Sequence, residues 1–368
     1  MGKIGVYFNP YASDEWSRER HPFLYLFAES LQAEGWSIIG VESEEMCRPR
    51  SLATRQFDLM HIHFPPPVYS PFTSRPYRIP IVRGILAWRA IRQMEQWADA
   101  IEAIGIPIVW QIHDLFSHHA IDVESLRKVD EQLRRRIYGL AKGVIVHENA
   151  CMPPVIEHFG EKALYAVTPL GDYTLIHGHP VPKDTARRHL GIQQNGRVLA
   201  YVGTARRNRN PSATVQQFLQ LAGPDDVLIL AGQAIGRFVP KRDDARIYLY
   251  DGSQPNEHMR DIFCAADFVI NDGREYLTSA IIRAAISYGV PVIAYPFGSA
   301  LDTADGAAFY ISSDSDGLRT ALNKALRCDA ATYTQMQANA LKRNAERRWD
   351  AYGPSCTALY RTILSQKR

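Results

Sequence analysis

The sequence predicts an α/β protein built from two parallel-sheet domains in tandem, and three observations lead to this prediction. The chain has 368 residues, more than one hydrophobic core usually contains. Apolar residues make up 46% of it and charged residues 22%, a balance typical of folded globular proteins. Short β-branched runs alternate with segments of helical spacing, which is the order that gives a parallel sheet covered by helices.

The first series of predicted strands fills the N-terminal half of the chain. Its members are residues 3–8, 36–42, 58–64, 106–114 and 143–148. Residues 21–35 and 85–105 have the apolar spacing of helices between them. Gly105 ends the second of these segments, as the residue after a helix C-terminus often does.

The alternation begins again after a polar passage that is rich in Gly and Pro, at residues 170–184. Predicted strands of the second series are residues 197–203, 226–232, 246–252, 267–272 and 290–295, with helices at 211–222, 255–265 and 278–288. We therefore expect one domain over residues 1–174, a second over 175–345, and a C-terminal helical segment over 346–368. Trp349, Tyr352 and Tyr360 are spaced to face one side of that last segment, so it should pack on a domain.

Charge, cysteine content and hydropathy exclude several classes of protein. A net charge of +3 with interspersed signs predicts no nucleic-acid partner, so any anion site must be local. Five scattered cysteines form neither a disulfide framework nor a zinc motif. The N-terminus has no signal-peptide core, and no apolar run is long enough to span a membrane. We expect a cytoplasmic protein.

The segment YVGTARRNRN, residues 201–210, predicts an anion site. Gly203 would let the backbone turn at the end of a strand, and Arg206, Arg207 and Arg209 follow it. In open parallel sheets, ligands bind beyond the carboxyl ends of the strands. Guanidinium groups there suit a diphosphate, because each can bind two oxygens. The alternative is a solvated loop with surface salt bridges.

A second anion site is predicted in residues 274–295. Thr278 and Ser279 lie where a helix should begin, so their hydroxyls and the free backbone N–H groups could hold a phosphate. Taken alone, an ordinary N-cap explains these residues equally well. Two such sites at strand ends of one domain favour a phosphate ligand.

The motifs resemble those of GT-B glycosyltransferases of the family-four type. The matching pieces are GTARRNRN, LILAGQ, CAADFVIND and SYGVPVIAYPFGS, preceded by DLMHIHFPP and IVWQIHDLFSHH and followed by RRWDAYGPSCTALYRTIL. The resemblance implies two Rossmann-like domains facing across a cleft, with the C-terminal helix crossing back to the first. It also implies a nucleotide sugar on the second domain, an acceptor on the first, and no metal or other cofactor. Arg206 and Arg209 match the basic pair that neutralises the donor diphosphate.

One departure from the family pattern bears on stereochemistry. Retaining members usually carry two glutamates eight positions apart, and those positions are Tyr276 and Ala284 here, with Glu275 beside the first. We place Glu275 and Tyr276 with the donor-binding residues. The sequence is similar, more narrowly, to exopolysaccharide β-mannosyltransferases of xanthan-type assembly. That likeness implies an inverting transfer from GDP-mannose to a lipid-linked oligosaccharide. We therefore expect a transfer from GDP-mannose or a UDP-sugar to a lipid-linked saccharide in bacterial polysaccharide or glycolipid synthesis.

An inverting transfer needs a base near the acceptor hydroxyl. Asp114 is the preferred candidate, and His113 could act there or touch the sugar or phosphate; both could instead cap the next segment. Four further histidines are candidates for the acceptor side of the cleft: His61, His63, His118 and His119. For His61 and His63, which alternate on one strand face, a structural role is the alternative. The run HDLFSHH has no zinc-site spacing, so we expect no metal.

Residues 70–97 mix arginines with aromatic residues, which predicts either contact with anionic lipid or an amphipathic helix packed on the first sheet. Three other functions remain open. They are a retaining transferase of the same fold, a sugar-nucleotide epimerase or phosphorylase, and a catalytically silent protein that binds nucleotide sugars.

Overall fold

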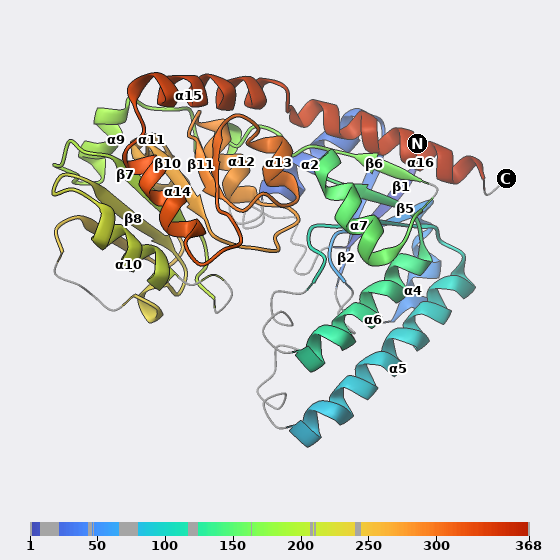
Figure 1. The fold of residues 1–368 in the computed structure, drawn as a ribbon. Coiled ribbons are helices and arrows are strands. Elements are labelled where there is room, and N and C mark those ends of the chain that lie inside the picture. Colours follow the sequence, from blue (N-terminus) through green and yellow to red (C-terminus); the bar gives the residue numbers. More distant parts are fainter. Residues whose placement is uncertain are drawn as a thin grey trace. The chain divides into compact units, whose positions relative to one another are not determined.

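The structure is a computed structural model that describes residues 2–7, 22–42, 46, 48–65, 80–116, 124–162, 164–206, 209, 211–239 and 244–366. The chain divides into two compact units (Figure 1). The first unit is Met1–Pro169 with Trp349–Arg368, and the second is Leu170–Arg348. The sequence placed the boundaries at 174/175 and 345/346, close to these positions.

The first unit is built on a six-stranded sheet in the order β2-β1-β3-β4-β5-β6, and every pairing is parallel. The strands are β1 Lys3–Tyr7, β2 Ser37–Val41, β3 Leu59–Ile62, β4 Ile108–Gln111, β5 Ala141–Val146 and β6 Tyr165–Val167. The alternation of runs predicted the first five and missed β6. β4 ends three residues earlier than expected, so His113 and Asp114 lie in the loop beyond it.

Helices cover this sheet, and their bounds are α2 Pro22–Ala33, α4 Pro49–Leu52, α5 Pro80–Ile104, α6 Glu124–Leu140, α7 Met152–Phe159 and α16 Tyr352–Ser365. In the described part of this unit, 3-10 turns accompany them at η1 Ala53–Arg55, η4 Asn149–Cys151 and η6 Trp349–Ala351. α5 and α6 lie side by side (Figure 1). Gly105 ends α5 with φ 69°, and its N–H donates to the Ile101 carbonyl at 3.2 Å, which confirms the predicted C-terminus.

The C-terminal helix α16 packs on α2 of the first unit. Trp36 Nε1 donates to Thr357 Oγ1 at 2.9 Å. The Ser30 hydroxyl donates to the Trp349 carbonyl at 2.8 Å and accepts the Gly353 N–H at 2.6 Å. These bonds fix the start of α16 against α2. The aromatic residues predicted to face one side of the tail, Trp349, Tyr352 and Tyr360, are all buried.

The second unit repeats the plan with a parallel sheet in the order β12-β11-β10-β7-β8-β9. Its strands are β7 Val198–Val202, β8 Val227–Gly232, β9 Ile247–Asp251, β10 Phe268–Asn271, β11 Val292–Ala294 and β12 Ala308–Tyr310. The short edge strand β12 was not predicted. The chain adds β8 and β9 on one side of β7 and then β10 on the other. The switch point, where ligands bind in such sheets, therefore lies between β7 and β10.

The helices of this unit are α8 Thr174–His177, α9 Lys183–His189, α10 Pro211–Leu221, α11 Asn256–Ala265, α12 Ala280–Ser287, α13 Ser299–Thr303, α14 Gly317–Leu326 and α15 Ala330–Ala345, with the 3-10 turn η5 Ile235–Arg237. β7 is buried along its whole length, as a strand covered on both faces must be. In the described parts of both units, no helix combines the length and apolar character needed to cross a membrane.

Candidate functional site

Loops from β7 and β8 meet closely at the carboxyl edge of the second sheet. Gly203 follows β7 with φ 126°, and Gly232 ends β8 with φ 141°. A Cβ on Gly232 would lie 2.1 Å from the Gly203 carbonyl oxygen, so only glycine allows the two loops to approach. The Gly252 N–H, after β9, donates to the Gly232 carbonyl at 2.9 Å. Three neighbouring strands thus end in backbone that is held together by its own hydrogen bonds.

The arginine loop begins directly after Gly203. Arg206 and Arg209 form a reciprocal backbone pair, with N–H to carbonyl distances of 3.0 and 3.1 Å. Arg206 is partly exposed, and within the described residues its guanidinium has no hydrogen-bond or ion-pair partner. Arg207 lies outside the described residues. Arg206 therefore fits the prediction of a positively charged side chain at the end of this strand.

Arg209 folds back over the end of β7, which the sequence did not predict. Its side chain is buried, and Nη2 donates to the Val202 carbonyl at 2.6 Å. Its Nη1 occupies the space that a Gly203 side chain would need, because an added Cβ would lie 2.2 Å from it. The guanidinium also lies 5.1 Å from the centre of the Tyr201 ring. Arg209 therefore holds the loop against the end of β7 and also contributes a positive charge to it.

Asp272, just after β10, is the acidic partner of Arg209 across the switch point. Arg209 Nε lies 3.8 Å from Asp272 Oδ1. Burial raises the pKa of the Asp272 carboxyl above its usual range, and the Arg209 charge opposes that rise. The pair links the loop after β7 to the loop after β10, so the charge on Arg209 is partly balanced within the protein.

The predicted helix start is present, but its two hydroxyl residues differ. Ser279 is the N-cap of α12: its Oγ accepts the Ile282 N–H at 3.3 Å and an Asn271 Nδ2–H at 2.6 Å. Its side chain is buried and caps the helix, and its O–H hydrogen is not used in these two bonds, so a ligand phosphate as its acceptor stays a prediction. Thr278 Oγ1 has no hydrogen-bond partner in the described part of the chain and remains a candidate ligand.

Glu275 and Tyr276 lie in the turn between β10 and α12, and both are partly exposed. The Tyr276 ring covers Gly273, where an added Cβ would lie 2.0 Å from Tyr276 Cε2. Arg274 donates from Nε to the Tyr295 hydroxyl at 3.0 Å. The structure thus keeps the predicted donor-binding segment 275–279 at the same sheet edge as the arginine loop.

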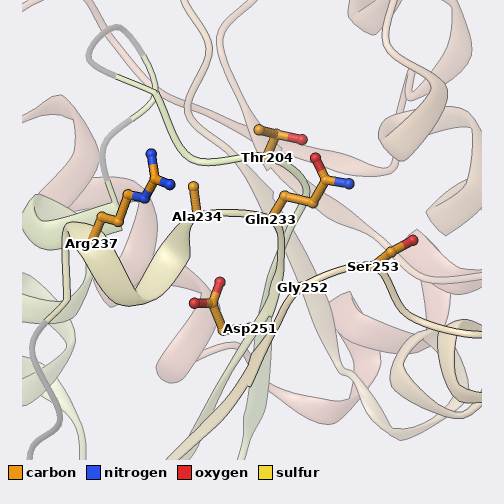
Figure 2. A pocket seen from close by; sticks show the side chains of 7 residues that line it. All are labelled: Thr204, Gln233, Ala234, Arg237, Asp251, Gly252 and Ser253. Atoms are coloured by element: carbon orange, nitrogen blue, oxygen red, sulfur yellow. The ribbon is translucent and has the colours of Figure 1, made fainter.

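A pocket of about 510 Å³ opens beyond β7, β8 and β9. Figure 2 shows its lining: Thr204, Gln233, Ala234, Arg237, Asp251, Gly252 and Ser253. Asp251 Oδ1 accepts the Ile235 N–H at 3.0 Å, which fixes the 3-10 turn η5 in the pocket wall. Such a volume is of the size of small-ligand sites in proteins.

The carboxyl edge of the first sheet carries a second cluster. His63 and His147 come directly after β3 and β5, and His113 is the second residue after β4. His147 Nε2 lies 3.1 Å from His113 Nδ1, and His63 Nδ1 lies 3.4 Å from His113 Nε2. Asp114 follows and is partly exposed; its backbone carbonyl accepts Arg134 Nη1–H at 2.9 Å. The predicted catalytic pair therefore sits in a loop that Arg134 fixes.

The structure corrects the acceptor-side role predicted for His61. This side chain is fully buried, and its Nδ1 and Nε2 contact the Tyr360 hydroxyl at 2.5 Å and Gln111 Oε1 at 3.1 Å. It belongs to the core under α16. His63 is also buried and stacks on His61 with ring centres 4.4 Å apart. His118 and His119 lie outside the described residues.

Burial determines the charge state of these histidines. It lowers the pKa of His61 to about 3 and that of His147 to about 4. Burial also lowers the pKa values of His63 and His113 well below 6.5, and neighbouring histidines lower them further. All four rings are therefore neutral at neutral pH. Among the described residues, no group of three or more His, Cys, Asp or Glu side chains is arranged to hold a metal ion.

Sequence reasoning missed His147, Gln111 and Asp272. His147 could have been found from its position, because it follows β5 as His63 follows β3. Gln111 is a polar residue inside a buried strand, which is unusual enough to be a signal. No comparable signal pointed to Asp272, whose partner Arg209 is distant in sequence.

No model of a known protein family matches the sequence, and no curated protein is significantly similar to it. Solved structures do match. Sucrose-phosphate synthase from Thermosynechococcus elongatus is 16% identical over 100% of both chains, with a TM-score of 0.72. HepE from Anabaena in complex with UDP is 14% identical over 98% of this chain and 100% of its own, with a TM-score of 0.67. The α,α-trehalose 6-phosphate synthase from Burkholderia multivorans is 14% identical over 100% of both, with a TM-score of 0.65.

The fold is that of GT-B glycosyltransferases. The full coverage of both chains means that the two sheets and their order along the chain are shared. This confirms the fold predicted from the motifs.

Proposed function

We propose that the protein is a glycosyltransferase that moves a sugar from a nucleoside diphosphate sugar to a saccharide acceptor. The observation that carries the proposal is the carboxyl edge of the second sheet. There, glycine-ended strands, the arginine loop and the start of α12 surround the switch point beside a pocket of about 510 Å³. A nucleotide suits the pocket and a diphosphate suits the charged loop.

The diphosphate is assigned to the groups nearest the switch point. Arg206 supplies a partly exposed guanidinium, and Arg209 adds a second positive charge that Asp272 only partly balances. Thr278 Oγ1 and the first N–H groups of α12 supply uncharged donors. Each charge-assisted hydrogen bond to a phosphate contributes roughly 1.5 to 3 kcal/mol.

The structural neighbours support this class of donor. HepE has been crystallised in complex with UDP and with UDP-glucose, and its fold matches this chain over nearly its full length. A trehalose-phosphate synthase from Burkholderia vietnamiensis that is described as UDP-forming and a glycosyltransferase from Rickettsia africae have the same fold. We assign the donor to a UDP-sugar or GDP-mannose, and we include no metal or other cofactor in the proposal.

The acceptor is assigned to the first unit, with Asp114 as the base of an inverting transfer. Asp114 follows β4 at the edge where parallel sheets bind ligands, and Arg134 fixes its backbone. The family's second glutamate position is Ala284 here, on the buried face of α12, so no carboxylate acts from that position. Inversion by Asp114 requires none.

The acceptor is proposed to be a lipid-linked saccharide in bacterial polysaccharide or glycolipid synthesis, with the protein on the inner face of the cell membrane. In the described part of α5, Ile85 and Trp88 are 56% and 58% exposed, and Arg92 lies over the Trp88 ring. Trp97, further along α5, is buried and donates to the Met46 carbonyl. The helix therefore packs at one end and presents aromatic and basic residues at the other.

Cosedimentation with lipid vesicles tests this contact. We expect recovery with anionic vesicles, weaker recovery with neutral ones, and loss of the difference in Trp88→Ala/Arg89→Ala. Each basic residue near anionic lipid contributes about 1 kcal/mol. Equal recovery of the unaltered protein with both kinds of vesicle would remove membrane docking while leaving the transferase proposal intact.

Calorimetric titration with UDP and GDP, followed by transfer assays, tests the transferase proposal. Arg206→Ala should weaken nucleoside diphosphate binding by about tenfold or more, because a charged hydrogen bond is lost. Asp114→Asn should keep that affinity and lower turnover by about 100-fold or more. Arg319→Ala is the matched control, because Arg319 is an exposed arginine on α14 that bonds Gln217 and Gln220.

Two results would overturn the assignments. Unchanged binding in Arg206→Ala would remove the arginine loop from the donor site. A product with the donor's anomeric configuration, determined by NMR, would replace inversion with retention.

A further inference from the structure

A backbone carbonyl at the edge of the first sheet determines where the protons lie in the buried histidine cluster. The Thr168 carbonyl lies 3.1 Å from His147 Nδ1, and a carbonyl can only accept a hydrogen bond. His147 Nδ1 therefore carries a hydrogen. Burial lowers the pKa of His147 to about 4, so the ring is neutral at neutral pH and its Nε2 is an unprotonated acceptor.

Two groups face that acceptor, and both must be donors. Gln111 Nε2 lies 3.1 Å from His147 Nε2, nearer than its 3.5 Å distance to Nδ1. His113 Nδ1 also lies 3.1 Å from His147 Nε2. His113 is neutral as well, since burial and the neighbouring His147 lower its pKa well below 6.5. A neutral ring that donates from Nδ1 has an unprotonated Nε2.

The donor and acceptor roles of the remaining groups in the cluster follow from these assignments. With its amide nitrogen toward His147, Gln111 turns Oε1 toward His61 Nε2 at 3.1 Å, so His61 donates from Nε2. His61 Nδ1 then accepts from the Tyr360 hydroxyl on α16 at 2.5 Å. In each of these contacts one atom donates and the other accepts. The Thr168 carbonyl sets the direction of every bond, because it can only accept. Tyr360 lies at the opposite end, and its hydroxyl can donate or accept, so it does not determine these directions.

We infer that the Thr168 carbonyl, acting through His147, holds His113 as the Nδ1–H tautomer, so that His113 Nε2 is a hydrogen-bond acceptor for a substrate hydroxyl. The phosphates of a nucleotide sugar carry no hydrogen at neutral pH, so they are excluded as partners of this nitrogen. His147 and Gln111 are positioning residues. The identity of the ligand as a sugar hydroxyl rests on the proposed transferase function, whereas the tautomer does not.

Within the described residues, His113 Nε2 contacts His63 Nδ1 at 3.4 Å. That distance is at the outer limit of a hydrogen bond, so a hydroxyl at normal distance would be the stronger partner. His113 is partly exposed, and Phe64 stacks on its ring with centres 5.0 Å apart. The ring plane is therefore fixed by stacking while the proton position is fixed by His147.

Nitrogen-15 NMR of the full-length protein labelled at histidine reads the tautomer directly. We expect a protonated Nδ1 and an unprotonated Nε2 for His113 at neutral pH, with the signal assigned by its loss in His113→Gln. A protonated Nε2, or an averaged signal from both tautomers, would overturn the inference. The NMR measurement needs no substrate, so it tests the tautomer of His113 whether or not sugar transfer is detected.

Two substitutions of His147 separate positioning from core packing. His147→Gln can still donate to Thr168 and accept from His113 Nδ1, so it should keep the tautomer and most of the turnover. His147→Leu removes the acceptor, so His113 should leave the Nδ1–H form and kcat should fall by about tenfold. Affinity for UDP or GDP should be unchanged in both, because the proposed donor site is in the second unit.

Tyr360→Phe is the control for damage to the cluster itself. It removes the Tyr360 bond to His61, yet the direction set at Thr168 is unaffected, so the His113 tautomer and kcat should both be retained. Equal kcat in the Gln and Leu variants of His147 would show a purely structural cluster and overturn the positioning role. If His147→Leu does not fold, the tautomer in the unaltered protein and in His147→Gln still decides.

Discussion

Arg209 illustrates how a residue that is proposed to bind the ligand can also stabilise the fold. Its side chain is buried against the strand end that Gly203 leaves open, and its guanidinium is shared between the Val202 carbonyl and Asp272. A diphosphate would meet a cation whose position is already fixed, so little side-chain entropy would be lost on binding. The Arg206 guanidinium has no such partner within the described residues, so its positive charge is not balanced by a nearby carboxylate.

At this edge of the second sheet, the sequence predicted which residues are present better than it predicted which residues they contact. Gly203, Arg206 and Thr278 could be assigned from local order, because strand, turn and helix start are encoded within a few positions. The cap role of Ser279 and the pairing of Arg209 with Asp272 depend on contacts between separate loops. Single-sequence reasoning has no access to those contacts, and the same limit hid the link between His61 and Tyr360.

Elements were predicted well where periodicity is long and poorly where strands are short and lie at a sheet edge. β6 and β12 are three-residue edge strands and both were missed, whereas β11, which also has three residues but lies inside its sheet, was predicted. The segment 106–114 was predicted as one strand because its apolar character continues through Ile112. In the structure it divides into β4 and a loop that carries His113 and Asp114. The candidate catalytic residues His113 and Asp114 therefore lie just beyond the last strand residue that pairs in the sheet.

The contact between α2 and α16 depends on the absence of a side chain at Gly353. An added Cβ would lie 2.2 Å from the Ser30 carbonyl oxygen, which is fixed backbone of α2. We expect Gly353→Ala to lower the free energy of unfolding by about 1 to 3 kcal/mol, the usual effect of overpacking. Urea unfolding followed by circular dichroism measures it.

The matched control, Gly139→Ala, should change the free energy of unfolding in the opposite direction. Gly139 lies in α6 with no atom within 4 Å of an added Cβ, so Gly139→Ala should raise stability by about 0.5 to 1 kcal/mol. If Gly353→Ala stabilised the protein as Gly139→Ala does, the tight seat of α16 on α2 would be wrong.

At the scale of the whole molecule, the two units share a plan but differ in which side chains they bury at the carboxyl edges of their sheets. The first unit buries neutral histidines, and the second buries an arginine beside an aspartate. The tandem arrangement itself was predicted because each unit repeats the strand and helix order within its own stretch of chain. Which histidines are buried was not, since burial depends on how α2 and α16 cover the sheet.

The buried histidines predict that the first unit is the acid-sensitive one. Their folded pKa values are lowered below 6.5, so the unfolded chain binds more protons in mild acid. Their contribution is therefore complete above about pH 6.5 and is lost as pH falls toward about 4. For His147 alone, a fall from 6.5 to about 4 corresponds to a loss on the order of 3 kcal/mol.

Hydrogen exchange with mass spectrometry, corrected for intrinsic rates, locates this loss. Between about pH 6.5 and about pH 5, protection should fall more in β3, β4 and β5 than in β7 and β8. The histidines of the second unit whose pKa is lowered, His177 and His258, are partly exposed and should contribute less. His147→Gln removes one titrating ring, so it should retain more protection in the first unit on acidification. Equal loss of protection in the two sheets would contradict the assignment of these rings as neutral and buried.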